Sequence, residues 1–294
     1  HTARQDSTPL VALVGQVPTE ARYREAFQEV DLVAHFSPLV KRVFEIPTTE
    51  RIPELLQQAF RVARSERPGP VVVGLPEDVL FREIADVPAR SPVRLHPPRA
   101  ASEAVAEALD LLDTAERPVL LLGREVLTTG ATELVRELAE KLALPVMTAF
   151  RRFDAFPNDH ASYVGNIAFG TPAAVLRPLE EADLLVGLGT RFSEITTAEY
   201  RYPLPGTRVL HVTAAAETAG SWGHDVTPVV SDVKLFLQDL LELVSERAAD
   251  ASAARSSRLR DYREGYERLT RFDEPAELRG TSISGVLQAI SERA

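Results

Sequence analysis

The sequence predicts an α/β protein: a doubly wound parallel sheet preceded by part of a second α/β domain. From residue 102 onward, helical patterns alternate with apolar runs, which is the order typical of parallel sheets. The run Leu184–Leu188 follows an acidic helix end and is continuously apolar, as expected for a strand buried on both faces of such a sheet. A proline-rich segment at 87–100 separates this region from the first.

Three apolar runs in the first region, 10–14, 42–46 and 70–75, are predicted strands. Residues 52–63 carry apolar side chains at helical spacing, so we expect an amphipathic helix there. Weaker patterns predict short helices at 22–29 and 31–40. No regular element suits the prolines of the following segment, which is therefore a predicted interdomain linker containing Pro88, Pro92, Pro97 and Pro98.

The second region is expected to repeat a helix-then-strand unit. The predicted strands are 119–122, 145–148, 184–188, 208–212 and 228–230, and the predicted helices are 102–112, 132–142, 172–181 and 233–244. The last of these helices is expected to be capped by Ser231 or Asp232. A small, polar stretch at 248–257 predicts a break, followed by a charged helix at 258–269 and another helix at 281–293.

Composition excludes several classes of function. The 294 residues contain no cysteine, so disulfides, a thiolate nucleophile and a cysteine zinc site are excluded. The net charge of -10 argues against a nucleic-acid partner, since no excess of cations can neutralise phosphates. No apolar run is long enough to span a bilayer and the first residues do not form a signal sequence, so we expect no membrane partner and a cytoplasmic location.

A candidate ligand site follows the strand Leu184–Leu188. Ligands of open α/β sheets bind beyond the carboxyl ends of the strands, and glycines there let a phosphate approach the backbone. Gly187 and Gly189 fit this pattern, although they could equally serve only a tight turn. Phe192 stands where a dinucleotide fingerprint has its third glycine, which weakens a dehydrogenase interpretation.

Other chemistries lack support in the sequence. Neither a phosphate-binding GxxxxGK[ST] loop nor the G-x-S-x-G motif of serine hydrolases is present. His160 follows Asn158 and Asp159 but has no partner at metal-ligand spacing, so we expect a loop histidine with a solvent or backbone partner. No metal site is predicted.

Two blocks of sequence resemble a known family. DSTPLVALVGQVP, AFQEVDLVAHFSPLVKRVFEI and RPGPVVVGLPEDV are similar to the second half of the pyrimidine-binding domain of thiamine diphosphate-dependent enzymes of the acetolactate synthase type. LALPVMTAFRRFDAFPNDHASYVGNIAFGTP, EEADLLVGLGTRFSE, RVLHV and VVSDV resemble their Rossmann-like middle domain. The resemblance covers most of positions 6–245. It implies half a pyrimidine-binding domain at 1–86, a linker at 87–100, the middle domain at 101–247, and at 248–294 a linker and the start of a diphosphate-binding domain.

The resemblance implies a carboligase or decarboxylase that acts on 2-oxo acids with thiamine diphosphate and Mg²⁺, assembled as a homo-dimer or homo-tetramer. By match, Gln16 faces the cofactor and substrate, and Phe27 and Lys41 line the substrate approach. Phe27 could instead be a core residue, and Lys41 a solvated surface lysine. The family's activating glutamate and its GDG diphosphate motif have no counterpart in these 294 residues. We therefore expect the chain to be catalytically incomplete by itself.

Some members of the family hold FAD or another ADP-containing ligand in the middle domain. The residues that match such contacts are Gly123, Arg124, Thr148, Gly170, Gly189, Arg191 and Asp232. Arg191 could donate two hydrogen bonds to a phosphate or could form a salt bridge. Thr213 and Ala215 replace the aspartates usual in flavin-binding members, which argues against ribose recognition and FAD. The alternative function is a noncatalytic nucleotide-binding module.

Overall fold

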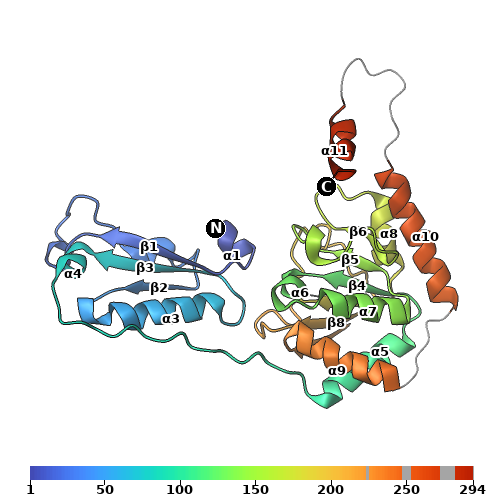
Figure 1. The fold of residues 1–294 in the computed structure, drawn as a ribbon, viewed down its shortest axis with the longest axis horizontal. Helices are drawn as coiled ribbons and strands as arrows, with labels where there is room; N and C mark the ends of the chain where they lie inside the picture. Colours follow the sequence, from blue (N-terminus) through green and yellow to red (C-terminus); the bar gives the residue numbers. More distant parts are fainter. Residues whose placement is uncertain (223–224, 247–252, 272–281, 294) are drawn as a thin grey trace. The chain divides into compact units, whose positions relative to one another are not determined.

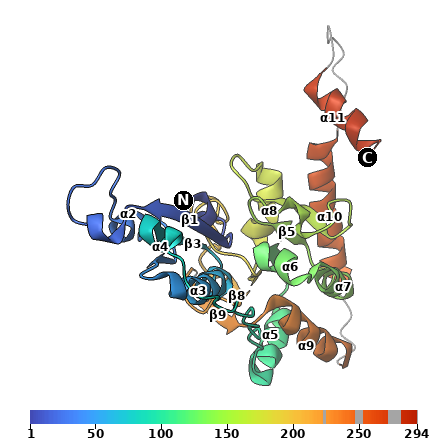
Figure 2. The same ribbon diagram turned by 60° about the vertical axis from the view of Figure 1, so that its left-hand side comes forward.

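The computed structural model describes residues 1–222, 225–246, 253–271 and 282–293. The chain divides into two compact units, His1–Pro97 and Pro98–Ala294. Residues 87–100, which contain this boundary, form neither a helix nor a strand. Each unit contains a parallel sheet with flanking helices (Figures 1 and 2), so the predicted α/β fold class is confirmed.

The first unit is built on a three-stranded sheet in the order β1-β3-β2, with all strands parallel. β3 is buried because it lies between the other two strands and under α3, whose apolar stripe packs on Val71 and Val73. The strands are β1 (Leu10–Gln16), β2 (Arg42–Glu45) and β3 (Pro70–Pro76). The helices are α1 (Thr2–Gln5), α2 (Leu32–Phe36), α3 (Ile52–Arg64) and α4 (Glu77–Phe81), with the 3-10 turns η1 (Thr19–Ala21) and η2 (Thr49–Arg51).

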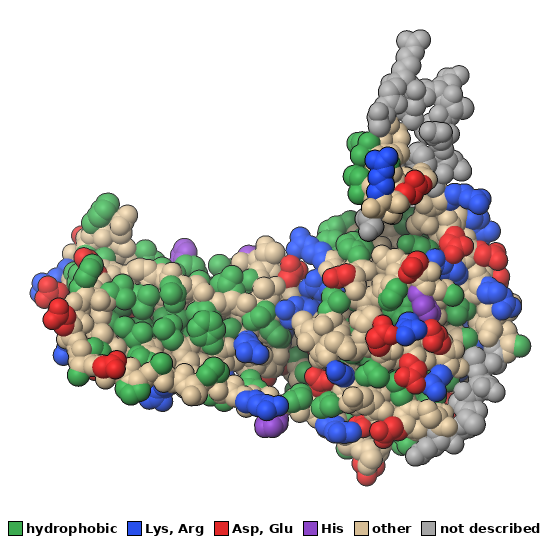
Figure 3. Space-filling model, in the orientation of Figure 1, with side chains coloured by type: hydrophobic (Ala, Val, Ile, Leu, Met, Phe, Trp, Pro, Cys, Tyr) green, Lys and Arg blue, Asp and Glu red, His purple; other side chains and the backbone are tan. Residues whose placement is uncertain are grey.

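β1 is an edge strand with an apolar surface. Its Leu10 and Leu13 side chains are 43% and 59% exposed, which is high for leucines on a strand. Figure 3 shows hydrophobic side chains gathered on the visible face of this unit. An exposed apolar edge of this kind is open to pairing with another strand.

The predicted helix at 22–29 is wrong. Tyr23, Glu25 and Gln28 have positive φ angles of 62°, 56° and 65°, which no right-handed helix accommodates. The Glu29 carboxylate accepts hydrogen bonds from the backbone N–H groups of Tyr23 (2.6 Å) and Ala26 (3.3 Å), which gives this loop an alternative to helical pairing. The helix expected at 31–40 shortens to α2, whose end precedes Pro38 by two residues.

The second unit contains a six-stranded parallel sheet in the order β6-β5-β4-β7-β8-β9. This is the order of dinucleotide-binding sheets, in which the chain reverses direction across the sheet between the two central strands, here β4 and β7. The strands are β4 (Pro118–Leu122), β5 (Val146–Thr148), β6 (Tyr163–Asn166), β7 (Leu184–Leu188), β8 (Arg208–Thr213) and β9 (Asp225–Val230).

Alternate side chains of the central strands face two different layers of helices. Leu120 and Leu122 of β4 join a core with α5, α6, α7 and α9, whereas Val119 and Leu121 join a core with α8 and Tyr262 of α10. β7 is buried along its whole length, as predicted for a strand covered on both faces. The helices are α5 (Ser102–Thr114), α6 (Arg124–Thr129), α7 (Thr132–Leu142), α8 (Ala173–Glu181), α9 (Val233–Glu246), α10 (Ala253–Thr270) and α11 (Ile283–Ser291), with the 3-10 turn η3 (Phe153–Ala155).

Several elements of this unit differ from the prediction. β6 and α6 were not predicted, because each is short and carries no clear period. α10 begins at Ala253, so the break expected at 248–257 is wrong for its last five positions. Residues 248–252 and Thr281, where the last helix was expected to begin, lie outside the described residues. Among the described helices, none combines the length and apolar character needed to cross a bilayer.

α10 is fixed to the unit through hydrogen bonds as well as packing. The Tyr262 hydroxyl donates to Glu181 Oε2 (2.8 Å), and Arg255 Nη2 donates to the carbonyls of Leu112 and Ala115 at the end of α5 (both 2.5 Å). These arginine bonds satisfy carbonyls that a helix end leaves without intrahelical partners. α10 therefore joins the carboxyl ends of α5 and α8.

Replacing Tyr262 with Phe should lower the free energy of unfolding by about 1 kcal/mol, because a hydrogen bond to a partly exposed carboxylate is lost while the ring remains. Chemical denaturation of the purified chain measures this change. Tyr266→Phe is the matched control, since the Tyr266 hydroxyl makes no hydrogen bond within the described residues and its ring packs edge-on against Tyr163. Equal effects of the two substitutions would contradict the role given to the Glu181 bond.

Candidate functional site

The candidate site is the edge of the six-stranded sheet where β4 and β7 end. Gly123 follows β4, and its N–H donates to the Leu188 carbonyl (2.9 Å). A Cβ atom at Gly123 would lie 2.2 Å from the Gly189 carbonyl oxygen and 2.3 Å from the Thr190 Cα, so the two loops touch through their backbones. Gly189 itself has φ +59°. Both glycines are therefore required by local geometry.

Glu125, in the first turn of α6, connects three strand ends at this edge. Its N–H donates to the Gly189 carbonyl (3.2 Å). Its carboxylate accepts hydrogen bonds from the Thr213 hydroxyl (2.6 Å) and from the Ala214 N–H (2.9 Å) at the end of β8. Burial raises the pKa of the Glu125 carboxyl, and the hydrogen bonds from Thr213 and Ala214 oppose this shift. The sequence did not indicate a role for Glu125, since an acidic residue in a first helical turn is common.

His211 of β8 is buried and neutral. Its Nδ1 accepts a hydrogen bond from the Gly220 N–H (3.1 Å), so Nε2 carries the proton and donates to the Thr190 carbonyl (2.9 Å). Burial lowers the pKa of the imidazole, and the Thr190 carbonyl opposes that shift. Phe192 packs edge-on against this ring, with 4.8 Å between centroids. His211 thus fixes the loop that follows β7, a role that the sequence did not indicate.

The predicted nucleotide contacts are distributed along the whole edge. Gly123 and Gly189 meet at its centre; Arg124 directly follows Gly123, and Arg191 lies two residues after Gly189. Thr148 is completely buried and its hydroxyl lies 3.4 Å from that of Tyr163, so it lines the core. The remaining two contacts follow the two edge strands of the sheet, with Gly170 in the loop after β6 and Asp232 after β9, and the edge strands of a six-stranded sheet are about 24 Å apart.

Asp232 and His160 have local structural roles. The Asp232 carboxylate accepts hydrogen bonds from the N–H groups of Lys234 (2.9 Å) and Leu235 (3.1 Å), so it is the residue that caps α9. The other proposed cap, Ser231, instead accepts a hydrogen bond from the Ala100 N–H (3.1 Å). His160 lies 3.1 Å from Glu140 and accepts from the Ser162 N–H. Within the described ranges no group of three potential metal ligands occurs.

The catalytic candidates of the first unit do not converge. Gln16 ends β1 at the carboxyl edge of the sheet, where it is buried and donates to the Val30 carbonyl (2.6 Å). Lys41 precedes β2 at the opposite, amino edge, and its Nζ donates to the Ser65 carbonyl (2.6 Å). The length of β1 separates these edges by about 20 Å. Phe27 is 88% exposed, so the core position considered for it is wrong.

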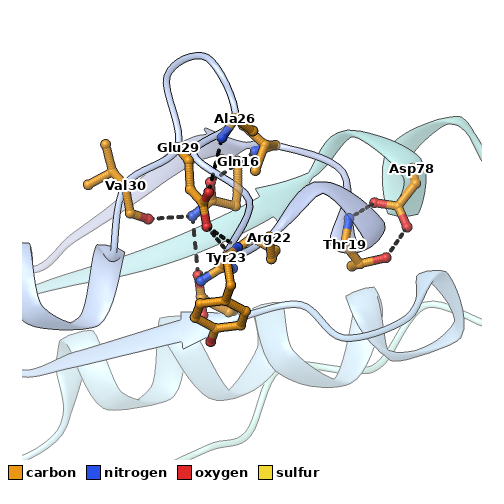
Figure 4. A network of polar contacts seen from close by, with 10 residues as sticks. Gln16, Thr19, Arg22, Tyr23, Ala26, Glu29, Val30 and Asp78 are labelled. Atoms are coloured by element: carbon orange, nitrogen blue, oxygen red, sulfur yellow. Dashed lines mark hydrogen bonds and ion pairs between the residues drawn. The ribbon is translucent and has the colours of Figure 1, made fainter.

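A polar network that the sequence did not indicate surrounds Gln16 (Figure 4). Arg22 Nη1 lies 2.9 Å from Glu45 Oε1, and Gln16 Nε2 lies 3.4 Å from the same oxygen. Arg22 also faces Glu29 at 3.6 Å, and the Tyr23 N–H bonded to Glu29 holds the pKa of that carboxyl below its usual range. Gln16 is therefore held in place by neighbours from the loop after β1 and from β2.

Comparison with known proteins relates both units to one family. Residues 105–240 match the model of the thiamine pyrophosphate enzyme central domain. The probable acetolactate synthase large subunit of Methanocaldococcus jannaschii is 36% identical over 246 residues, which are 82% of this chain and 42% of the relative. Residues 105–240 therefore match the central domain of thiamine pyrophosphate enzymes, and the similarity to the acetolactate synthase relative extends into the first unit. This confirms the resemblance found in the sequence.

Two further relatives and one solved structure are similar to this chain. The acetolactate synthase large subunit of Parasynechococcus marenigrum is 32% identical over 90% of this chain and 44% of its own length. The glyoxylate carboligase of Escherichia coli O157:H7 is 31% identical over 84% of this chain and 42% of its own length. The crystal structure of benzoylformate decarboxylase from Polynucleobacter necessarius matches with a TM-score of 0.78 at 23% identity, covering all of this chain and 53% of that one. The chain thus spans 42–44% of the length of the three curated relatives and 53% of the solved structure.

Gly189→Ala should destabilise the chain more than Gly130→Ala. Both glycines have positive φ angles, but a Cβ at Gly189 would lie 2.3 Å from the Glu125 Cβ, whereas nothing lies within 4 Å at Gly130. The backbone strain, about 1 kcal/mol, is common to both, and overpacking adds about 1–3 kcal/mol at Gly189 alone. Equilibrium unfolding in urea compares the two variants. Equal losses would show that the backbones of the site are not in close contact.

His211→Gln should change how stability depends on pH. Because burial lowers the folded-state pKa of His211, the unfolded chain takes up a proton first as the pH falls below about 6.5. The stability contributed by the neutral ring is present above that pH and is lost as the pH decreases toward the folded-state pKa. The difference in free energy of unfolding between the native chain and His211→Gln should therefore shrink between about pH 7 and pH 5. A constant difference across this range would contradict the buried, neutral state.

Proposed function

We propose that this chain supplies the middle domain and part of the pyrimidine-binding domain of a thiamine diphosphate-dependent carboligase or decarboxylase that acts on 2-oxo acids. The observation that carries the proposal is the similarity to acetolactate synthases and a glyoxylate carboligase, which extends over 82–90% of the chain and so includes both units. The strand order of the sheet alone would not support this function, because sheets of this kind serve many unrelated functions.

The described residues do not by themselves assemble a site for the cofactor. Gln16 lies at a carboxyl edge, where ligands of parallel sheets bind, but Lys41 lies at the opposite edge of the same sheet. No group of three acidic or histidine side chains in the described ranges is placed to hold Mg²⁺. We therefore derive no catalytic step from this chain, and we propose that the complete site requires residues beyond those described.

Assembly and location belong to the same proposal. The apolar, unpaired edge of β1 and the exposed Leu13 on it support a homo-dimer or homo-tetramer as the working form. The proposed location is the cytoplasm, as expected from the sequence.

A noncatalytic nucleotide-binding module is the second candidate. The strand order and the glycines at the switch point favour it. The carboxylate of Glu125 and the contact between the loops after β4 and β7 oppose it.

A chimera tests the main proposal. The 246-residue segment of the Methanocaldococcus jannaschii relative that aligns with this chain is replaced by its counterpart from this chain. With thiamine diphosphate and Mg²⁺, the chimera should release CO₂ from at least one of pyruvate, glyoxylate and benzoylformate, whereas the isolated chain should not. Gln16→Ala should lower this rate at least about tenfold, which corresponds to about 1.4 kcal/mol in the barrier.

Gln58→Ala is the matched control, because Gln58 lies on α3 and its side chain bonds, among the described residues, to Glu54 of the same helix. Light scattering on the same samples measures the oligomeric state. A folded, oligomeric chimera that releases no CO₂ from any of the three acids would contradict the proposal.

A further inference from the structure

The turn that follows β4 differs from a nucleotide-binding turn in the backbone and side-chain groups that it places at the crevice. In sheets of this strand order, the ligand enters the crevice at the switch point, and glycines at the first turn let the backbone approach the pyrophosphate. Here Gly123 is followed by Arg124 and Glu125, and the space beside the Gly123 Cα is taken by the Gly189 carbonyl, 2.2 Å from a Cβ position. A carbonyl oxygen repels phosphate rather than binding it.

Glu125 fills the next part of the crevice with its own acceptor groups. Its backbone contacts Gly189, where an added Cβ would lie 3.0 Å from the Glu125 Cα. Its two carboxylate oxygens bond to the Thr213 hydroxyl and the Ala214 N–H. These are the donors that the end of β8 could have offered to a ligand. The Thr213 hydroxyl oxygen also accepts from the Ala215 N–H (3.2 Å), so its proton and one of its two lone pairs are used within the chain.

Charged groups of both signs lie along this edge, with Arg124 and Arg191 as well as the carboxyl groups of Glu125 and Asp232. Asp232 lies near enough to Glu125 to raise the pKa of its carboxyl further, and Arg124 acts in the opposite direction. A pyrophosphate placed here would bring more negative charge next to these two carboxyl groups in a partly desolvated position.

We propose that Glu125 acts as an internal ligand that closes the switch-point crevice of the second unit, so that this unit binds neither FAD nor another ADP-containing nucleotide. The inference rests on the geometry of the second unit. It is independent of the proposed activity on 2-oxo acids.

Thermal unfolding of the full chain with FAD and with ADP tests the nucleotide half of the proposal, with a flavin-binding relative as positive control. A nucleotide that binds the folded chain would raise its Tm with concentration. We expect no rise for either compound. A saturable rise with FAD or ADP would overturn the proposal.

Variants of Glu125 test the internal-ligand half. Glu125→Ala should lower the Tm by about 4–8 °C, because two hydrogen bonds to a carboxylate are lost. Glu217→Ala, which removes an exposed carboxylate from the loop after β8, should leave the Tm within about 1 °C. If both variants behaved alike, Glu125 would not connect the strand ends and the proposal would fall.

A double-mutant cycle then separates a specific bond from general packing. Thr213→Val and Glu125→Ala should each be destabilising, and their losses should be clearly less than additive in the double variant, because both remove the same hydrogen bond. Additive losses would overturn the assignment of Glu125 as the ligand of Thr213.

Discussion

The second unit depends on the close backbone contact between β4 and β7. These strands pair in register from Pro118 with Leu184 to Leu122 with Leu188, and the pairing continues beyond them through the Gly123 N–H. All other strands are added outward from this pair, β5 and β6 on one side and β8 and β9 on the other. A side chain at Gly123 would separate the strand ends, and the displacement would be transmitted to both halves of the sheet.

The carboxyl edge is held together by two titratable side chains whose charge states suit their partners. His211 is neutral, since Gly220 offers it an N–H and Thr190 offers it a carbonyl. Glu125 accepts from a hydroxyl and an N–H, which suits a carboxylate. Burial of a polar group costs free energy unless its hydrogen bonds are made, and both groups make theirs. The loops after β4, β7 and β8 are thereby connected without a bound ligand.

The parts of the fold that follow from period and length were predictable from the sequence. The run 184–188 could only be a strand covered on both faces, and the stripe on residues 52–63 predicted α3. The loop at 22–29 was not predictable, because its conformation depends on hydrogen bonds from Tyr23 and Ala26 to Glu29 that compete with helix formation.

The residues of the candidate site were also predictable from the sequence only in part. Gly189 was found because a glycine at a strand end has a local meaning, whereas Glu125 was missed because its importance comes from Thr213, which is 88 residues away in the chain. Gln16 and Lys41 were grouped by their match to a family. Only the register of β1 and β2 on β3 shows that they lie at opposite edges of the sheet. Long-range pairing is the information that a single sequence lacks.

A crevice closed by its own side chain changes what the unit can contribute to an enzyme. A nucleotide stabilises its domain by RT ln(1 + [L]/Kd), which depends on the ligand concentration, whereas Glu125 is covalently part of the chain and is always present. In thiamine diphosphate-dependent enzymes the thiamine cofactor supplies the difficult chemistry and the protein supplies position and electrostatics. In this unit the strand ends are fixed by contacts of Gly123, Glu125 and His211 that belong to the chain itself, so their geometry does not depend on a nucleotide.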